Sequence, residues 1–140
     1  DTLYVNITNI GDTKISYAYP EESFTQNIAI LTVKEIRFAS GRIQKFTEPV
    51  VVTGEKDWEK VIISNNPEYV AGFEEYGPVK EMDMKPYGVQ SVLEKNAIKK
   101  AKIIAARKGA HVVFVYSNQF SHSPWNNVTI SGTAYGYSSE

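Results

Sequence analysis

The chain has 140 residues, of which 42% are hydrophobic and 22% are charged, as in one globular domain or two small modules. It contains no cysteine, which excludes a disulfide framework, a thiolate metal site and a cysteine nucleophile. The longest apolar run, Val112 to Tyr116, is far below the ~18 residues that a membrane-spanning helix needs. The start at Asp1 carries no signal-peptide pattern, and we expect that a leader was removed before it.

The net charge of −1 conceals an uneven distribution along the chain. Residues 1–53 carry −1, residues 54–89 carry −4 and residues 90–140 carry +4. The bases of the last segment lie in one predicted helix, where Lys95, Lys99 and Lys102 share a face because they are spaced four and three residues apart. This basic face is either a site for phosphate or anionic lipid, or a solvated outer surface. The overall acidity argues against a nucleic-acid-binding protein.

The first 53 residues are predicted to form a small, strongly bent β-module. Two alternating stretches, 3–7 and 15–19, flank a turn and form a hairpin, and a third stretch covers residues 24–31. A second hairpin follows, with strands near 35–38 and 43–46, and Gly41 supplies the positive φ of its turn. The pattern resets around Thr53-Gly54, which predicts a boundary between lobes 1–53 and 54–140 of one compact unit.

The second lobe is predicted to be an antiparallel sheet packed against one helix at about residues 91–108. A strand is expected to begin at Trp58 and Val61, and Ser91 is the expected N-cap, with Glu94 completing a capping box. An apolar stripe of leucine and alanine recurs every fourth residue, at positions 93, 97, 101 and 105. Gly109 ends the helix in a left-handed cap. The predicted fold class is therefore α+β.

After Gly109 the chain is expected to enter a buried strand, Val112 to Tyr116, which pairs with Val128 to Ile130 across a polar loop, 117–127. That loop contains Phe120, His122 and Trp125, which we treat as a candidate contact loop because aromatic residues are favoured at interfaces. The alternative is an ordinary hairpin tip whose tryptophan folds back on the sheet.

The sequence contains no recognisable catalytic, cofactor or metal motif. His111 and His122 are the only imidazoles, and no neighbouring cluster completes the three or four ligands of a metal site. We expect His111 to be a core residue with its hydrogen bonds satisfied. No nucleophile elbow or phosphate-binding glycine loop is present, and the adjacent pairs Glu21-Glu22 and Glu74-Glu75 point to opposite faces of a strand.

One part of the chain, about residues 57–137, resembles a known group of proteins. The run from Lys100 to Val115, followed by Ser131-Gly-Thr-Ala-Tyr135, is similar to the alanine-rich helix, Gly-Ala-Asn turn and Gly-x-Ala-Tyr strand of small bacterial envelope lipoproteins. These include the outer-membrane stress sensor of the Rcs phosphorelay. The same region, with Gly77-Pro-Val79, is also similar to the YbjQ-type family described as heavy-metal-binding. The chain departs from the sensor in lacking its cysteines and in having His111 at the asparagine of the turn.

This resemblance, with the lack of catalytic motifs, leads us to expect a noncatalytic protein of the cell envelope. It implies the exported soluble part of a periplasmic or surface lipoprotein that contacts other envelope proteins and meets the membrane only through a lipid anchor before Asp1. One alternative is a homo-oligomeric module that binds a metal or small ligand, in which the −4 segment of one copy meets the +4 helix of another. A second is an unrecognised hydrolase in which His122 meets an acid and a serine.

Overall fold

The computed structural model describes residues 2–46 and 51–137 and separates the chain into two compact units. The first comprises Asp1–Pro49 and Pro67–Phe73, and the second comprises Val50–Asn66 and Glu74–Glu140. The division after residue 49 differs from the boundary at 53 proposed above, and a short segment from the middle of the chain joins the first unit. We describe each unit by itself.

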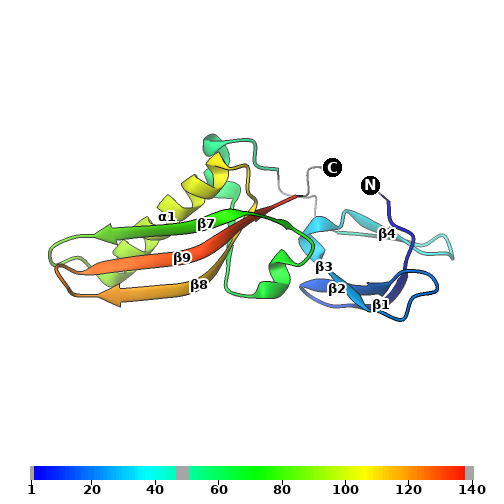
Figure 1. Cartoon of the computed structure of the whole chain (residues 1–140). Helices are drawn as coiled ribbons and strands as arrows, with labels where there is room; N and C mark the ends of the chain where they lie inside the picture. The colour runs from blue at the N-terminus through cyan, green and yellow to red at the C-terminus, as the bar shows by residue number, and fades with distance from the viewer. Residues whose placement is uncertain (1, 47–50, 138–140) are drawn as a thin grey trace. The chain divides into compact units, whose positions relative to one another are not determined.

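The first unit is built from two small antiparallel sheets (Figure 1). Strands β1 (Asn6–Ile10), β2 (Lys14–Ala18) and β3 (Gln26–Ala29) form one sheet, in the order β1-β2-β3. Strands β4 (Glu35–Arg37) and β5 (Ile43–Lys45) form the other, a hairpin whose turn contains Gly41 at φ 89°. A 3₁₀ turn, η1 (Ile30–Thr32), lies between the two sheets in the sequence. These strands confirm the small β-module expected from the alternating pattern.

A second 3₁₀ turn, η3 (Pro67–Val70), belongs to the first unit because it is bound to β2 and β3. The Ala29 amide donates to the carbonyl oxygen of Ala71 at 2.6 Å, and Lys14 forms an ion pair with Glu68 at 2.9 Å. Gly72, at φ 88°, lies so close to Ile28 that a Cβ there would be 2.8 Å from its side chain. The sequence pattern placed this segment in the second lobe, since pairing partners so distant in sequence leave no local signal.

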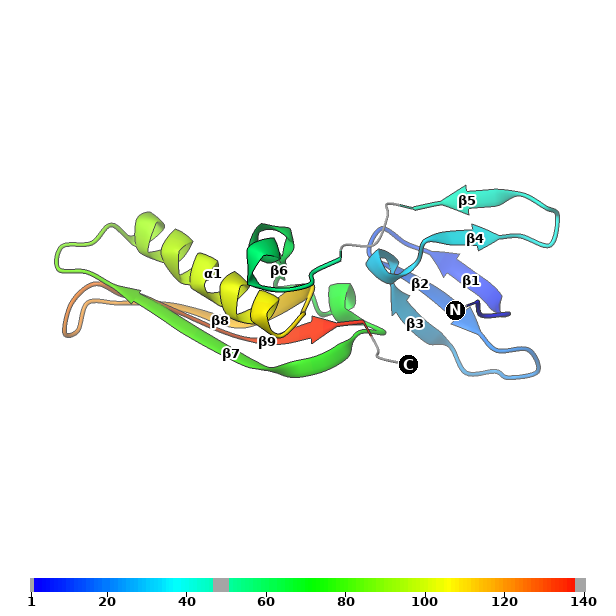
Figure 2. The same cartoon turned by 90° about the horizontal axis from the view of Figure 1, so that it is seen from above.

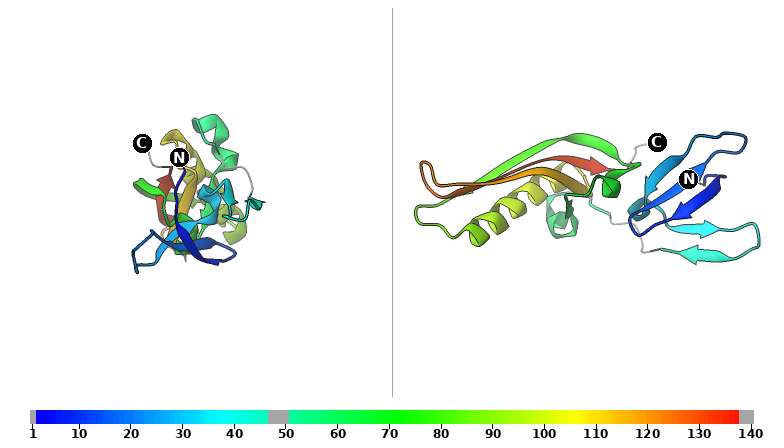
Figure 3. Two further views of the ribbon diagram at one scale, coloured as in Figure 1. Left: turned by 90° about the vertical axis from the view of Figure 1, so that its right-hand side faces the viewer. Right: turned by 90° about the horizontal axis from the view of Figure 1, so that it is seen from below.

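The second unit is one sheet with the helix α1 (Gln90–Arg107) against one face (Figures 1 and 3). The sheet order is β6-β8-β9-β7, with bounds β6 (Ile62–Ser64), β7 (Glu74–Met84), β8 (Val112–Ser121) and β9 (Asn127–Gly136). All pairings are antiparallel except that of the short edge strand β6, which runs parallel to β8. The α+β prediction is confirmed. Among the described residues, no helix combines the length and apolar character that crossing a membrane requires.

Three local predictions for the second unit are wrong. Trp58 lies in the 3₁₀ helix η2 (Glu55–Lys60) instead of a strand, because the Asp57 carboxylate accepts hydrogen bonds from the Thr53 amide and hydroxyl and turns the chain. Ser91 is not the N-cap, since α1 starts one residue earlier, after Val89, and no side chain caps it. The polar run 117–121 continues β8, so that Val112 pairs with Tyr135 instead of the 128–130 segment.

The core of the second unit lies between the alanine face of α1 and the sheet. Leu93, Ala97, Ala101 and Ala105 are buried, as the four-residue spacing predicts. They contribute to two apolar clusters, whose sheet members include Val79, Val113, Val128, Ile130 and Ala134. Short side chains on the helix allow its axis to come close to the strands. This close approach buries apolar surface in addition to the surface that the larger side chains cover.

The helix ends in the left-handed cap that the sequence predicts. Gly109 has φ 74°, and the amide of Ala110 donates to the carbonyl oxygen of Ala105 at 2.9 Å. This geometry reverses the chain within two residues. The His111 amide then donates to the carbonyl oxygen of Tyr135 in β9 at 2.8 Å. The turn therefore carries the chain from the helix directly into the centre of the sheet.

Gly132 provides a test of how closely β8 and β9 approach each other. A Cβ on Gly132 would lie 2.3 Å from the Phe114 carbonyl oxygen, at the place where a β-bulge shifts the register between Val115 and Ser117. We expect Gly132→Ala to lower the free energy of unfolding by about 1–3 kcal/mol, the usual cost of overpacking, in urea denaturation. The control is Gly54→Ala, which meets nothing within 4 Å and should change stability by less than about 0.5 kcal/mol. Equal effects of the two substitutions would contradict this explanation.

Candidate functional site

The predicted contact loop is a tight hairpin tip, because β8 and β9 extend further than the sequence pattern indicates. The tip consists of residues 122–126 and contains a cis peptide bond between Ser123 and Pro124. Phe120 lies in β8 and packs partly buried against the cluster around Leu93. His122 and Trp125 are exposed on the tip itself. The structure thus separates the three predicted residues into one that packs on the core and two that face solvent.

Asn126 connects this hairpin tip to the connection between β7 and α1. Its Nδ2 donates to the Gly88 carbonyl oxygen at 2.9 Å, and its own carbonyl oxygen accepts from the Lys85 amide at 3.0 Å. Its Oδ1 lies 2.8 Å from His122 Nδ1, and the His122 ring stacks edge-on with Phe120 at 4.7 Å. Both connections lie at the same end of the second unit, as the two perpendicular views show (Figures 1 and 2). Sequence reasoning gave Asn126 no role, since its partners are far away in the chain.

Four large apolar side chains at this end are exposed, and we call them the tip surface. They are Tyr87, Val89, Val92 and Trp125, with exposed fractions of 98%, 63%, 54% and 53%. Tyr87 also has φ 56°, a left-handed conformation that costs a non-glycine residue about 1–2 kcal/mol. No sequence pattern points to Tyr87, Val89 and Val92, because Pro86-Tyr-Gly88 has the composition of an ordinary turn. An aromatic ring held fully in solvent at a positive φ makes the tip surface a candidate contact site.

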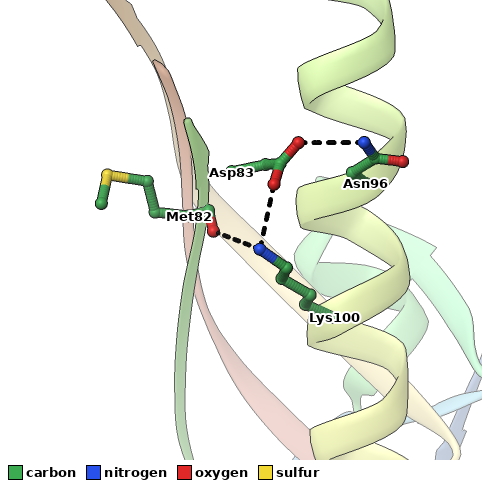
Figure 4. A network of polar contacts seen from close by, with 4 residues as sticks. All are labelled: Met82, Asp83, Asn96 and Lys100. Atoms are coloured by element: carbon green, nitrogen blue, oxygen red, sulfur yellow. Dashed lines mark hydrogen bonds and ion pairs between the residues drawn. The ribbon is translucent and has the colours of Figure 1, made fainter. Parts of the chain in front are cut away.

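The middle of α1 is fixed to the end of β7 by a polar network (Figure 4). The Lys100 ammonium donates to the Met82 carbonyl oxygen at 2.9 Å and to Asp83 Oδ1 at 3.0 Å, and Asn96 donates to Asp83 Oδ2 at 2.9 Å. The amide of Asn96, assisted by Lys100, lowers the pKa of Asp83 below its usual value and keeps the carboxylate charged. This network holds the end of β7 against the helix just before the exposed turn begins.

The predicted basic face is only partly free. Lys95 and Lys99 are exposed and Lys102 is half-buried, but the Lys99 ammonium lies 5.1 Å from the centre of the Trp58 ring, in a cation–π contact. Lys95 lies beside a shallow depression of about 340 Å³ lined by Ser91, Glu94 and Ile98. The ion pairs of the helix are made by other bases.

Some acidic side chains of residues 54–89, the segment with a net charge of −4, form ion pairs with bases of α1 in the same chain. Asp83 pairs with Lys100 at 3.0 Å, and Glu55 pairs with Arg107 at 2.9 Å. The Arg107 guanidinium lowers the pKa of Glu55 through a hydrogen bond and through its charge. These exposed pairs orient η2 and β7 on the helix and contribute little to stability individually.

His111 is buried as predicted, but its hydrogen bonding differs from the expectation. Only 6% of it is exposed, and its ring lies 4.1 Å from that of Tyr137. Within residues 2–46 and 51–137, its Nδ1 has no hydrogen-bond partner. Burial lowers the pKa of His111 below the usual 6.5, which keeps the ring neutral at pH 7. The side chain is a core residue that tolerates one unpaired nitrogen.

Among the described residues, neither histidine belongs to a group that could hold a metal ion. The described part of the chain contains no group of three or more histidine, cysteine, aspartate or glutamate side chains arranged to hold a metal ion. His122 Nδ1 faces the amide of Asn126 instead of a carboxylate. Comparison of the sequence with known families and with curated proteins finds no family model and no protein that matches it.

The burial of His111 generates a prediction about pH. Because the pKa of His111 is lower in the folded chain than the 6.5 of the unfolded chain, the unfolded chain binds an additional proton as the pH falls below 6.5. The free energy of unfolding should therefore decrease between about pH 7 and about pH 5, and His111→Phe should remove much of this decrease. Urea denaturation across this range measures the effect. His122→Phe is the matched control, and loss of the decrease in that variant instead would contradict the assignment.

The role of Asn126 generates a prediction about local stability. Asn126→Ala removes the hydrogen bond to Gly88 and the contact with His122. We therefore expect the free energy of opening the hairpin tip to fall by about 1–2 kcal/mol. Native-state hydrogen exchange of the amides in 85–89 and 122–127 measures this opening. Asn118→Ala, at an exposed position of β8, should leave these exchange rates unchanged. Faster exchange in both variants would show that the effect is not specific to the hydrogen bonds of Asn126.

Proposed function

We propose that the protein is a noncatalytic component of the cell envelope that acts through protein–protein contacts, with the tip surface as its contact site. The observation that carries the proposal is the exposure of Tyr87, Val89, Val92 and Trp125 at the end where Asn126 joins two connections. Tyrosine and tryptophan dominate binding energies because they offer a large rigid area that loses little conformational freedom.

The construction of the tip surface supports this proposal. Trp125 is held between two backbone anchors, since Asn127 Nδ2 donates to the carbonyl oxygen of Trp125 at 2.9 Å and to that of Ser123 at 3.3 Å. Asn127 itself is buried, and the Met82 to Lys100 network fixes the strand that leads to Tyr87. Exposed apolar groups on ordered connections bind with a smaller loss of entropy than the same groups on a free loop.

The location in the envelope rests on the resemblance of residues 100–115 and 131–135 to envelope lipoproteins. In this proposal the protein is exported, and a lipid anchor before the described chain attaches it to a membrane. Its contacts are with other envelope proteins, and the tip surface faces those partners.

The proposal is tested by photocrosslinking in the native host. A photoreactive phenylalanine analogue replaces Tyr87 or Trp125 in the full-length precursor, and cells are irradiated and fractionated before adducts are identified by mass spectrometry. We expect adducts with one envelope protein from both positions. The matched control is Tyr116, a tyrosine of β8 that is 65% exposed, which should give few or none.

A second substitution reduces the apolar area of the tip surface at an exposed position. Val89→Ser in the crosslinking variants should reduce the adduct yield by about fivefold, the effect of losing about 1 kcal/mol of contact energy. Equal adducts from Tyr116, or recovery of an unmodified protein in the cytosol, would contradict the proposal.

A further inference from the structure

The first unit contains a groove between two strand edges that pair with no other strand among residues 2–46 and 67–73. In this described part of the unit, β1 is the outer strand of the sheet β1-β2-β3 and β4 pairs only with β5, so that each has one edge without a strand partner. A groove of about 540 Å³ lies between them, lined by residues 5–10 on one side and 36–39 on the other. Figure 2 draws β1 and β4 side by side, with β2 and β5 on their outer sides.

Both walls of the groove alternate with the period of a β-strand. On the β1 wall, Val5 and Ile7 are half-buried whereas Asn6 and Thr8 are exposed. On the β4 wall, Ile36 is buried and Arg37 is exposed. A strand placed between these walls would therefore have one apolar face and one solvent-facing side, as β1 and β4 themselves have.

The charge of the groove indicates which residues the solvent-facing side would carry. The lining contains Arg37 and no acidic side chain. Arg42 adds a second cation, 4.0 Å from the centre of the Phe38 ring. Arg37 is paired with Glu35 at 2.8 Å, but 77% of its side chain is exposed, so an incoming carboxylate competes with a weak pair.

We propose that this groove binds an extended segment of a partner protein, in which apolar and acidic residues alternate, as a strand added between β1 and β4. The backbone groups of both edges would hydrogen-bond the segment, its apolar residues would lie along Ile7 and Ile36, and its carboxylates would meet Arg37. This mode obtains affinity from main-chain hydrogen bonds and specificity from every second side chain. It concerns a different unit from the tip surface and does not depend on the proposed contacts there.

The inference is tested with the full chain and a synthetic decapeptide of alternating valine and glutamate with blocked ends. In ¹H–¹⁵N spectra, the amides of residues 5–10 and 36–39 should shift together, and their hydrogen exchange should slow when the peptide binds. A peptide of the same sequence with N-methyl groups on every amide has no donor for either ladder and should protect neither edge. A valine–lysine peptide should bind more weakly because of Arg37 and Arg42.

Two substitutions that each replace a positive charge by glutamine distinguish an effect of the groove from a general effect of net charge. Arg37→Gln should weaken binding of the valine–glutamate peptide by about fivefold, whereas Lys45→Gln, on the outer strand β5, should change it by less than about twofold. The crosslinking at Tyr87 and Trp125 should be unaffected by either variant, so failure of this inference is distinguishable from failure of the proposed function.

Several results would overturn the inference. Equal binding of the N-methylated peptide, or shifts confined to the second unit, would exclude strand addition at the groove. Contacts between β1 and β4 amides in the free protein would show that the two edges already pair. Protection of the edges that rises with protein concentration in the absence of peptide would assign the groove to a second copy of the chain.

Discussion

The close approach of the alanine face of α1 to the sheet is the constraint on which the second unit depends. Ala97, Ala101 and Ala105 are fully buried, and Ala101 and Ala105 belong to one apolar cluster with Ala134 of β9. Because the helix lies close to the strands, Lys100 and Lys108 at its edge reach the main chain of β7 at Met82 and Pro78. The lysines therefore cover carbonyl groups on the edge strand of the sheet, which would otherwise be free to pair with another chain.

The sequence predicted those elements whose cause is local. The four-residue spacing identified α1 and its buried stripe, and Gly109 identified the cap, because helix periodicity and a left-handed turn are encoded within a few residues. The length of β8 was not predictable in this way. Ser117, Asn118 and Gln119 are polar and half or fully exposed, and only their pairing with β9 makes them a strand. A polar run beside solvent has the composition of a loop whether or not it is paired.

The candidate site was predicted in part for the same reason. The exposed positions of His122 and Trp125 agree with the polar run in which they stand, whereas Phe120 packs on the core. Asn126 forms hydrogen bonds with Gly88 and Lys85, about forty residues away. No pattern along the chain indicates a contact between residues so far apart. The sequence around Tyr87 indicates only a turn. Its left-handed backbone and its exposure are properties of the folded chain and leave no pattern in the sequence.

The tip surface and the groove between β1 and β4 offer different physical means of recognition. In the proposed contacts at the tip, the binding groups would be side chains, and one of them, Tyr87, is exposed at a positive φ that is costly for a non-glycine residue. In the proposed strand addition at the groove, the binding groups would be backbone amides and carbonyls, which tolerate many partner sequences as long as every second residue fits. Substitution at the tip would therefore be expected to change which partner is bound. Substitution along β1 or β4 would change affinity for a whole class of extended segments, since the ladder itself does not depend on side-chain identity.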